Sequence, residues 1–173
     1  LALMAYAVAE DPAVLTPFMV NLDGFALTHT YETVDVPTEE DADAFLPPYQ
    51  ATNCFDFEYP KNIGYSAGPD YNRYFKYYEH RDMLDAFEAI DRVEARFAEC
   101  FGRAYTGPIE AMNCDDAEVV LVTLGSIAGL ARESVARLRE QGKRVGLLRI
   151  RYMRPFPAKL IAEALAGAAA VGV

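Results

Sequence analysis

The pattern that most limits the fold of this sequence lies in residues 118–150, where a strand, a turn, a helix and a second strand are predicted in succession. Residues 118–123 and 144–150 are rich in β-branched and apolar side chains. Residues 127–141 repeat apolar side chains at helical spacing and stop at Gly142. Because strands that are joined by a crossover helix pair in parallel within one sheet, the pattern predicts an α/β fold.

The same domain is predicted to continue beyond the second strand. Pro155 and Pro157 flank Phe156 and precede a second helix at residues 158–166, and residues 168–173 begin a third strand. We expect this strand to be cut short, so that the sequence is an excerpt from a longer chain and ends inside an open α/β domain.

The first 35 residues indicate the end of a different domain. Residues 1–10 are expected to form the tail of a buried helix, because apolar side chains dominate them up to an Asp-Pro step. Residues 14–22 contain β-branched and aromatic side chains and predict a strand that leads into an Asp-Gly turn. Residues 25–33 then suggest a pocket rim or the start of a short helix.

The middle of the sequence predicts an irregular connector followed by one long helix. Prolines interrupt residues 36–70 at intervals too short for long helices, and the many aromatic rings favour burial against a domain or another subunit. Residues 81–101 form an amphipathic pattern, which ends at Gly102. Its apolar positions are Met83, Leu84, Phe87, Ile90, Phe97 and Phe101. The opposite, solvated face is predicted to carry Asp82, Asp85, Glu88, Asp91, Arg92, Glu94 and Glu99.

Charge, apolar runs and cysteines limit the partners of the chain. A formal net charge of −10 disfavours nucleic acid, because counterion release needs clustered Lys and Arg. The apolar runs are interrupted and too short to cross a membrane. Cys54, Cys100 and Cys114 form no metal-ligand pattern, so no zinc, iron–sulfur or other metal site is predicted. Such sparse cysteines fit a reducing cytoplasm, where we expect the protein to lie.

Gly125 and Ser126 are candidate binding residues, because they lie where a strand leads into a helix. The free N–H groups at a helix start can bind a carboxylate or a phosphate. The same pair of residues also suits a sharp turn and an N-cap without any ligand. No complete dinucleotide-binding or phosphate-loop motif accompanies them, so both interpretations stay open.

Two further candidates are an imidazole and a guanidinium group. Thr28, His29 and Thr30 place an imidazole between two hydroxyl groups, where it can accept a hydrogen bond, transfer a proton or serve the structure alone. Arg154 follows the second predicted strand, at the edge where open α/β sheets bind ligands. Its guanidinium can clamp a carboxylate or can stabilise the turn into the next helix.

Several landmarks occur in an order that is typical of one enzyme family. They are Leu22-Asp23-Gly24-Phe25 with Leu27-Thr28-His29-Thr30, Phe45-Leu46-Pro47-Pro48-Tyr49, Phe101-Gly102-Arg103 with Tyr105, Leu124-Gly125-Ser126, Gly146-Leu147-Leu148-Arg149-Ile150-Arg151, and Arg154-Pro155-Phe156-Pro157. Over nearly its whole length the chain resembles the alpha subunit of pyruvate:ferredoxin oxidoreductases and their 2-oxoacid relatives.

The resemblance implies a division into three parts. Residues 1–35 would be the C-terminal part of a pyrimidine-type thiamine-diphosphate domain, and residues 36–115 the aromatic connector with the long helix. Residues 116–173 would be an incomplete domain that resembles the transketolase C-terminal domain, with an open parallel sheet. Members of the family decarboxylate a 2-oxoacid oxidatively, pass its electrons to ferredoxin and transfer the acyl group to coenzyme A.

The resemblance also implies which components lie on other chains. Thiamine diphosphate and Mg²⁺ would be bound with a partner subunit, and 4Fe–4S clusters would lie on beta, gamma or delta-type subunits. The glutamate that activates the aminopyrimidine would precede residue 1, so no catalytic residue is assigned. The candidates for cofactor or substrate binding are Thr28, His29, Gly125, Ser126 and Arg154.

Three alternative functions remain open at this point. An aryl 2-oxoacid such as phenylglyoxylate would suit a stretch that departs from the pyruvate-type pattern. Its rings are Phe55, Phe57, Tyr59, Tyr65, Tyr71, Tyr74, Phe75, Tyr77 and Tyr78. A non-catalytic structural or interaction subunit would keep the scaffold without turnover. A transketolase-like or acetolactate-like enzyme without electron transfer fits the architecture but not the ordered landmarks.

Overall fold

The computed structural model describes residues 1–51, 53–64 and 66–173, so the prediction for Tyr65 lies outside the described residues. The chain forms two compact units, which are not consecutive in sequence. The helical unit consists of Leu1–Met19 and Val36–Arg103, and the sheet unit consists of Val20–Asp35 and Ala104–Val173. The predicted boundaries at residues 35/36 and 115/116 stay predictions.

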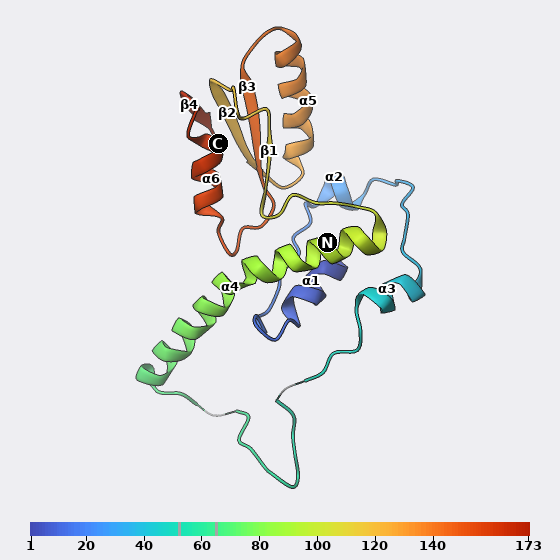
Figure 1. The fold of residues 1–173 in the computed structure, drawn as a ribbon, viewed down its shortest axis with the longest axis vertical. Coiled ribbons are helices and arrows are strands. Elements are labelled where there is room, and N and C mark those ends of the chain that lie inside the picture. Colours follow the sequence, from blue (N-terminus) through green and yellow to red (C-terminus); the bar gives the residue numbers. More distant parts are fainter. Residues whose placement is uncertain (52, 65) are drawn as a thin grey trace. The chain divides into compact units, whose positions relative to one another are not determined.

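The helical unit is built around one long helix. It contains α1 (Ala2–Ala9), α3 (Glu39–Phe45) and α4 (Pro69–Phe101), which are labelled in Figure 1. Helix α4 ends at Gly102 in the left-handed conformation, as predicted, but it begins at Pro69 rather than at residue 81. The earlier start has a local cause, because a proline in the first helical turn needs no hydrogen-bond donor. This part of the helix is rich in aromatic residues, which are only moderate helix formers. Apolar periodicity therefore did not predict it.

Helix α4 packs against both shorter helices through its C-terminal half. The ring of Phe45 on α3 lies 5.4 Å from that of Phe97 and 5.5 Å from that of Phe101. Glu94 was predicted on the solvated face, and this was wrong, because only 5 % of it is exposed. It lies four residues after Ile90 and three before Phe97, so the helix turns it toward the apolar side.

The sheet unit confirms the predicted parallel crossover. Strand β2 pairs in parallel with β3 and with β4, and Leu121 lies opposite Leu147. The sheet as a whole is mixed rather than parallel, because β1 pairs with β3 in the antiparallel direction. The strand order is β1-β3-β2-β4, with bounds β1 Ile109–Met112, β2 Val119–Leu124, β3 Val145–Ile150 and β4 Ala170–Gly172.

Two helices cover opposite faces of this sheet, α5 (Ile127–Glu140) and α6 (Ala158–Leu165) (Figure 1). Adjacent residues of β3 point to opposite faces, so Leu147 packs with Val135 of α5 while Leu148 packs with Ile161 of α6. Ile127 and Leu130 of α5 are 59 % and 69 % exposed, and they border an apolar groove beside β2 and β4.

Two sequence predictions for short elements were wrong. Residues 14–22 form no strand, because they have no neighbouring strand with which to form a ladder. Strand β1 was missed, since four residues at a sheet edge carry too short a pattern to identify. The predicted short helix after the Asp-Gly turn is present as α2 (Phe25–Thr28). No helix in the described ranges is long and apolar enough to cross a bilayer.

A matched pair of glycines tests the packing of the sheet unit. A Cβ atom added to Gly146 would lie 2.7 Å from the carbonyl oxygen of Asn113, whereas one added to Gly129 would meet no atom within 4 Å. We expect Gly146→Ala to lower the free energy of unfolding by about 1–3 kcal/mol, through overpacking. Gly129→Ala lies inside a helix and should raise it by about 0.5–1 kcal/mol. Denaturant unfolding of both variants measures the two effects, and equal effects would contradict this packing.

Candidate functional site

The carboxyl end of strand β2 leads directly into the start of α5. Gly125 adopts a φ of 76°, a conformation that glycine reaches without steric cost, as the sharp-turn interpretation requires. Ser126 occupies the N-cap position, but its side chain makes no capping hydrogen bond to the helix. The backbone N–H of Ser126, at the start of α5, therefore needs an acceptor from outside the helix.

That acceptor is a carboxylate from a distant part of the chain. The backbone N–H of Ser126 donates to Oδ2 of Asp23 at 2.7 Å, across 103 positions of sequence. A Cβ atom on Gly125 would lie 3.3 Å from each carboxylate oxygen of Asp23, so the close approach also favours glycine there. The helix start does receive a carboxylate, and this carboxylate belongs to the protein itself.

The contact changes the titration of Asp23. Hydrogen bonds from the hydroxyl group and the backbone N–H of Ser126 hold the pKa of the Asp23 carboxyl below its ordinary value of 3.8, and they outweigh the small opposing effect of desolvation. A lowered pKa means that the folded chain favours the charged form. The contact is therefore fully formed above pH 3.8 and is lost as the pH falls through the lowered pKa.

Helix α2 follows the Asp23-Gly24 turn, and its side chains form hydrogen bonds to that turn and to each other. The Thr28 hydroxyl donates to the carbonyl oxygen of Gly24 at 2.8 Å, and Nδ1 of His29 lies 3.0 Å from the same hydroxyl oxygen. Because that hydroxyl proton points to Gly24, we infer that Nδ1 carries a proton and that Nε2 is a free acceptor. The His29 ring also stacks on Phe25, with ring centroids 4.7 Å apart.

The structure connects four of the five predicted site residues. Thr28 and His29 are linked to Gly125 and Ser126 through the Asp23-Gly24 turn. Arg154 lies exposed in the loop after β3, and no hydrogen bond or ion pair between described residues joins it to the other four. Sequence reasoning used Asp23 only as a turn residue and missed its contact, because no local pattern reports a partner so far along the chain.

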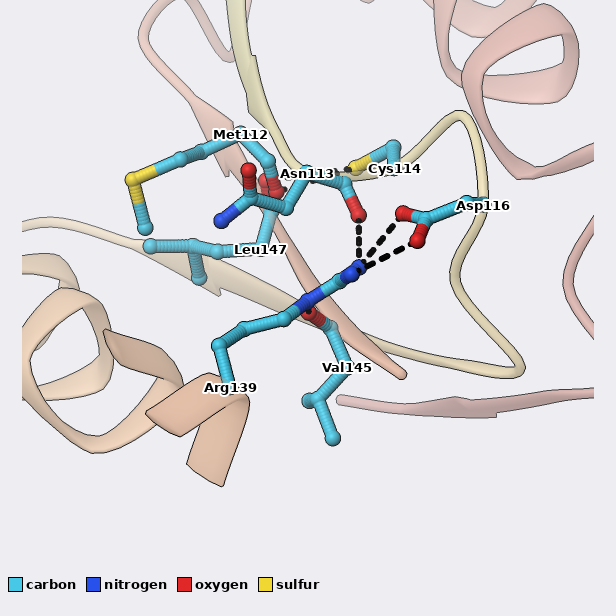
Figure 2. A network of polar contacts seen from close by, with 7 residues as sticks. All are labelled: Met112, Asn113, Cys114, Asp116, Arg139, Val145 and Leu147. Carbon is cyan, nitrogen blue, oxygen red and sulfur yellow. Dashed lines mark hydrogen bonds and ion pairs between the residues drawn. The ribbon is translucent and has the colours of Figure 1, made fainter. Parts of the chain in front are cut away.

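The opposite edge of the sheet carries a second polar network, which is drawn in Figure 2. The Arg139 guanidinium of α5 donates to both carboxylate oxygens of Asp116 at 2.8 Å, and to the carbonyl oxygens of Asn113 at 2.7 Å and Val145 at 2.6 Å. Hydrogen bonds from Arg139 lower the pKa of Asp116. These contacts join the C-terminal end of α5 to the loop between β1 and β2 and to the start of β3, so their role is structural.

Cys114 is the buried thiol of this network. Its Sγ donates to the carbonyl oxygen of Leu147 at 3.4 Å, and burial raises the pKa of the thiol. A raised pKa keeps the thiol protonated and unreactive.

Replacing Arg139 by Lys tests the structural role. A lysine cannot make parallel hydrogen bonds to a carboxylate and also reach two carbonyl groups. We expect Arg139→Lys to lower the Tm by about 4 °C or more. Arg137→Lys on the same helix is the control, because the Arg137 side chain is 72 % exposed and forms an exposed ion pair with Glu133 among the described residues. Equal Tm values in differential scanning calorimetry would contradict the role of Arg139.

Two known protein families match successive parts of this chain. The family described as pyruvate flavodoxin/ferredoxin oxidoreductase, thiamine-diphosphate-binding, matches residues 1–95. The family described as pyruvate:ferredoxin oxidoreductase core domain II matches residues 117–173. The chain belongs to the pyruvate:ferredoxin oxidoreductase family. The resemblance inferred from the ordered landmarks is thereby confirmed.

Individual relatives agree with this family. The chain is 44 % identical to pyruvate synthase subunit PorA of Methanothermobacter thermautotrophicus over 171 residues, which are 99 % of this chain and 44 % of that protein. It is 39 % identical to PorA of Methanosarcina barkeri over 97 % of this chain and 42 % of the relative. It is 40 % identical to ketoisovalerate oxidoreductase subunit VorA of Pyrococcus abyssi over 93 % of this chain and 40 % of the relative. The chain thus spans less than half the length of these relatives.

The described residues do not fit the diphosphate and Mg²⁺ end of thiamine diphosphate. Among them, no group of three or more His, Cys, Asp or Glu side chains could hold a metal ion. The start of α5 is not open to a phosphate either, because the Asp23 carboxylate already accepts from the N–H of Ser126. This chain alone therefore does not provide a complete cofactor site within its described part.

Proposed function

We propose that the chain is a portion of the alpha subunit of a 2-oxoacid:ferredoxin oxidoreductase of the pyruvate type. The observation that carries the proposal is the 44 % identity to a pyruvate synthase subunit over 99 % of this chain, with both family regions in order. The complete enzyme would convert pyruvate and coenzyme A to acetyl-CoA and CO₂ and would pass two electrons to ferredoxin.

Partner subunits would complete this enzyme. Thiamine diphosphate supplies the carbon–carbon bond cleavage in this family. In line with the family resemblance, the Mg²⁺ and diphosphate site would be held together with a partner subunit. Beta, gamma and delta-type subunits would also carry the 4Fe–4S clusters, since the only cysteines here are Cys54, Cys100 and Cys114. The chain would then be inactive alone.

The contribution of this chain would be an anchored segment that presents polar groups. Thr28 and His29 are exposed and lie on the short helix that follows Asp23. The free Nε2 of His29 would accept a hydrogen bond from substrate or cofactor in the assembled complex. Arg154 is the candidate for binding a carboxylate, because its guanidinium is exposed beyond the carboxyl end of β3.

The aromatic stretch does not favour an aryl 2-oxoacid. Phe55, Phe57 and Tyr59 are 76 %, 95 % and 73 % exposed. The cavity beside them is lined, among described residues, by Asn53, Cys54, Lys61, Asn62 and Ile63, with no aromatic ring. We therefore propose a small aliphatic 2-oxoacid as the substrate.

A substrate screen of the complete complex tests the proposed reaction. The full-length chain is reconstituted with its partner subunits, and reduction of ferredoxin or methyl viologen is followed with coenzyme A. Pyruvate, 2-oxoglutarate, 2-oxoisovalerate and phenylglyoxylate are compared. We expect the highest kcat/KM with pyruvate, because the chain is 44 % identical to one pyruvate synthase subunit and 40 % identical to a ketoisovalerate oxidoreductase subunit. No reduction with any of the four acids, or a preference for phenylglyoxylate, would refute the proposal.

The role of the imidazole is tested by His29→Ala in the same complex. Removing a positioned hydrogen-bonding group from a site commonly lowers kcat/KM, and we expect a loss of about 10-fold or more. His80→Ala is the matched control, since His80 is an exposed histidine on α4. An equal, small effect of both substitutions would show that His29 serves only the structure.

A further inference from the structure

The segment Val20–Asp35 belongs to the sheet unit although more than sixty residues separate it from the next part of that unit. Apolar burial does not hold it there, because helix α2 has no buried residue. Its other side-chain hydrogen bonds, from Thr28 and Thr30, stay within the segment. Among the described residues, the hydrogen bond between Ser126 and Asp23 is therefore the polar link between this segment and residues 104–173.

We propose that Asp23 is a positioning residue, whose carboxylate anchors Val20–Asp35 to the start of α5 and so fixes Thr28 and His29 at the carboxyl edge of the sheet. This inference rests on the proposed function for its kinetic consequence. Its structural part, the anchoring, stands on the contact between Asp23 and Ser126 alone.

The chemistry of the contact suits an anchor. A helix start carries partial positive charge and unpaired N–H groups, so a carboxylate binds there more strongly than a neutral acceptor. The neighbouring carbonyl oxygen of Gly24 accepts from the Thr28 hydroxyl, and that hydroxyl oxygen contacts His29. A displacement of Asp23 and the adjoining Gly24 would therefore be transmitted through these two short contacts to the imidazole.

The first test compares Asp23→Ala and Asp23→Asn with the unchanged full-length chain in the assembled complex. Asp35→Asn is the control, because Asp35 is an exposed carboxylate of the same segment with no hydrogen bond or ion pair among the described residues. Hydrogen–deuterium exchange of peptides covering residues 20–35 is the readout. We expect Asp23→Ala to speed exchange about 10-fold, since a hydrogen bond to a charged group is lost, and Asp23→Asn to speed it less. Unchanged exchange in Asp23→Ala would overturn the anchoring.

The second readout is a split between kcat and KM for the 2-oxoacid. Misplaced reacting or binding groups lower the rate of turnover, so we expect Asp23→Ala to lower kcat about 10-fold while KM changes by less than about 2-fold. Asp23→Asn should recover part of kcat, and Asp35→Asn should leave both constants unchanged. Faster exchange with an unchanged kcat would overturn the positioning role. An inactive unchanged complex would instead refute the proposed function, and the exchange result would still decide the anchoring.

A pair of glycines with the same backbone conformation gives an independent test. Gly125 and Gly142 both have a φ of 76°, so a side chain is equally strained at either position. Only at Gly125 does an added Cβ atom approach the Asp23 carboxylate, at 3.3 Å from both oxygens, whereas at Gly142 it meets nothing within 4 Å. We expect Gly125→Ala to speed exchange in residues 20–35 and Gly142→Ala to leave it unchanged. Equal exchange in the two variants would overturn the proposal.

Discussion

The parallel pairing of β2 with β3 is the constraint on which the candidate site depends. With Leu121 opposite Leu147, both strands end at the same edge, and the turn after β2 starts α5 there. Parallel strands place the starts of their crossover helices at this edge. The exposed N–H of Ser126 then becomes the place where Asp23 binds, so the position of a segment far away in sequence follows from the register of two central strands.

The two edges of the sheet have different physical characters. At the amino edge, Arg139 binds Asp116 and two backbone carbonyl groups, and the buried thiol of Cys114 stays protonated beside them. That edge is closed by contacts within the sheet unit. At the carboxyl edge the polar side chains of α2 remain exposed, and one carboxylate holds the segment that carries them. An edge of this kind is suited to completion by another chain, as the proposed function requires.

Periodicity in the sequence predicted those elements that local patterns define. The crossover with its turn at Gly125 and the end of α4 at Gly102 belong to this group, because glycine positions and apolar spacing are local signals. Strand β1, the early start of α4 at Pro69 and the burial of Glu94 were not predicted, since each depends on tertiary partners or on residues with weak propensity. Four predicted site residues are connected in the structure, but the residue that connects them, Asp23, could not be found without coordinates.

The candidate site depends on the contact by which Asp23 binds the start of α5 and fixes the segment that carries Thr28 and His29. An experimental structure of the assembled complex, at a resolution that shows individual carboxylate oxygens, measures this directly. We expect a distance between Asp23 Oδ2 and the Ser126 nitrogen close to 2.7 Å, with the Thr28 hydroxyl donating to the Gly24 carbonyl oxygen. A structure in which a phosphate or a partner's side chain occupies the start of α5, and Asp23 points elsewhere, would contradict it.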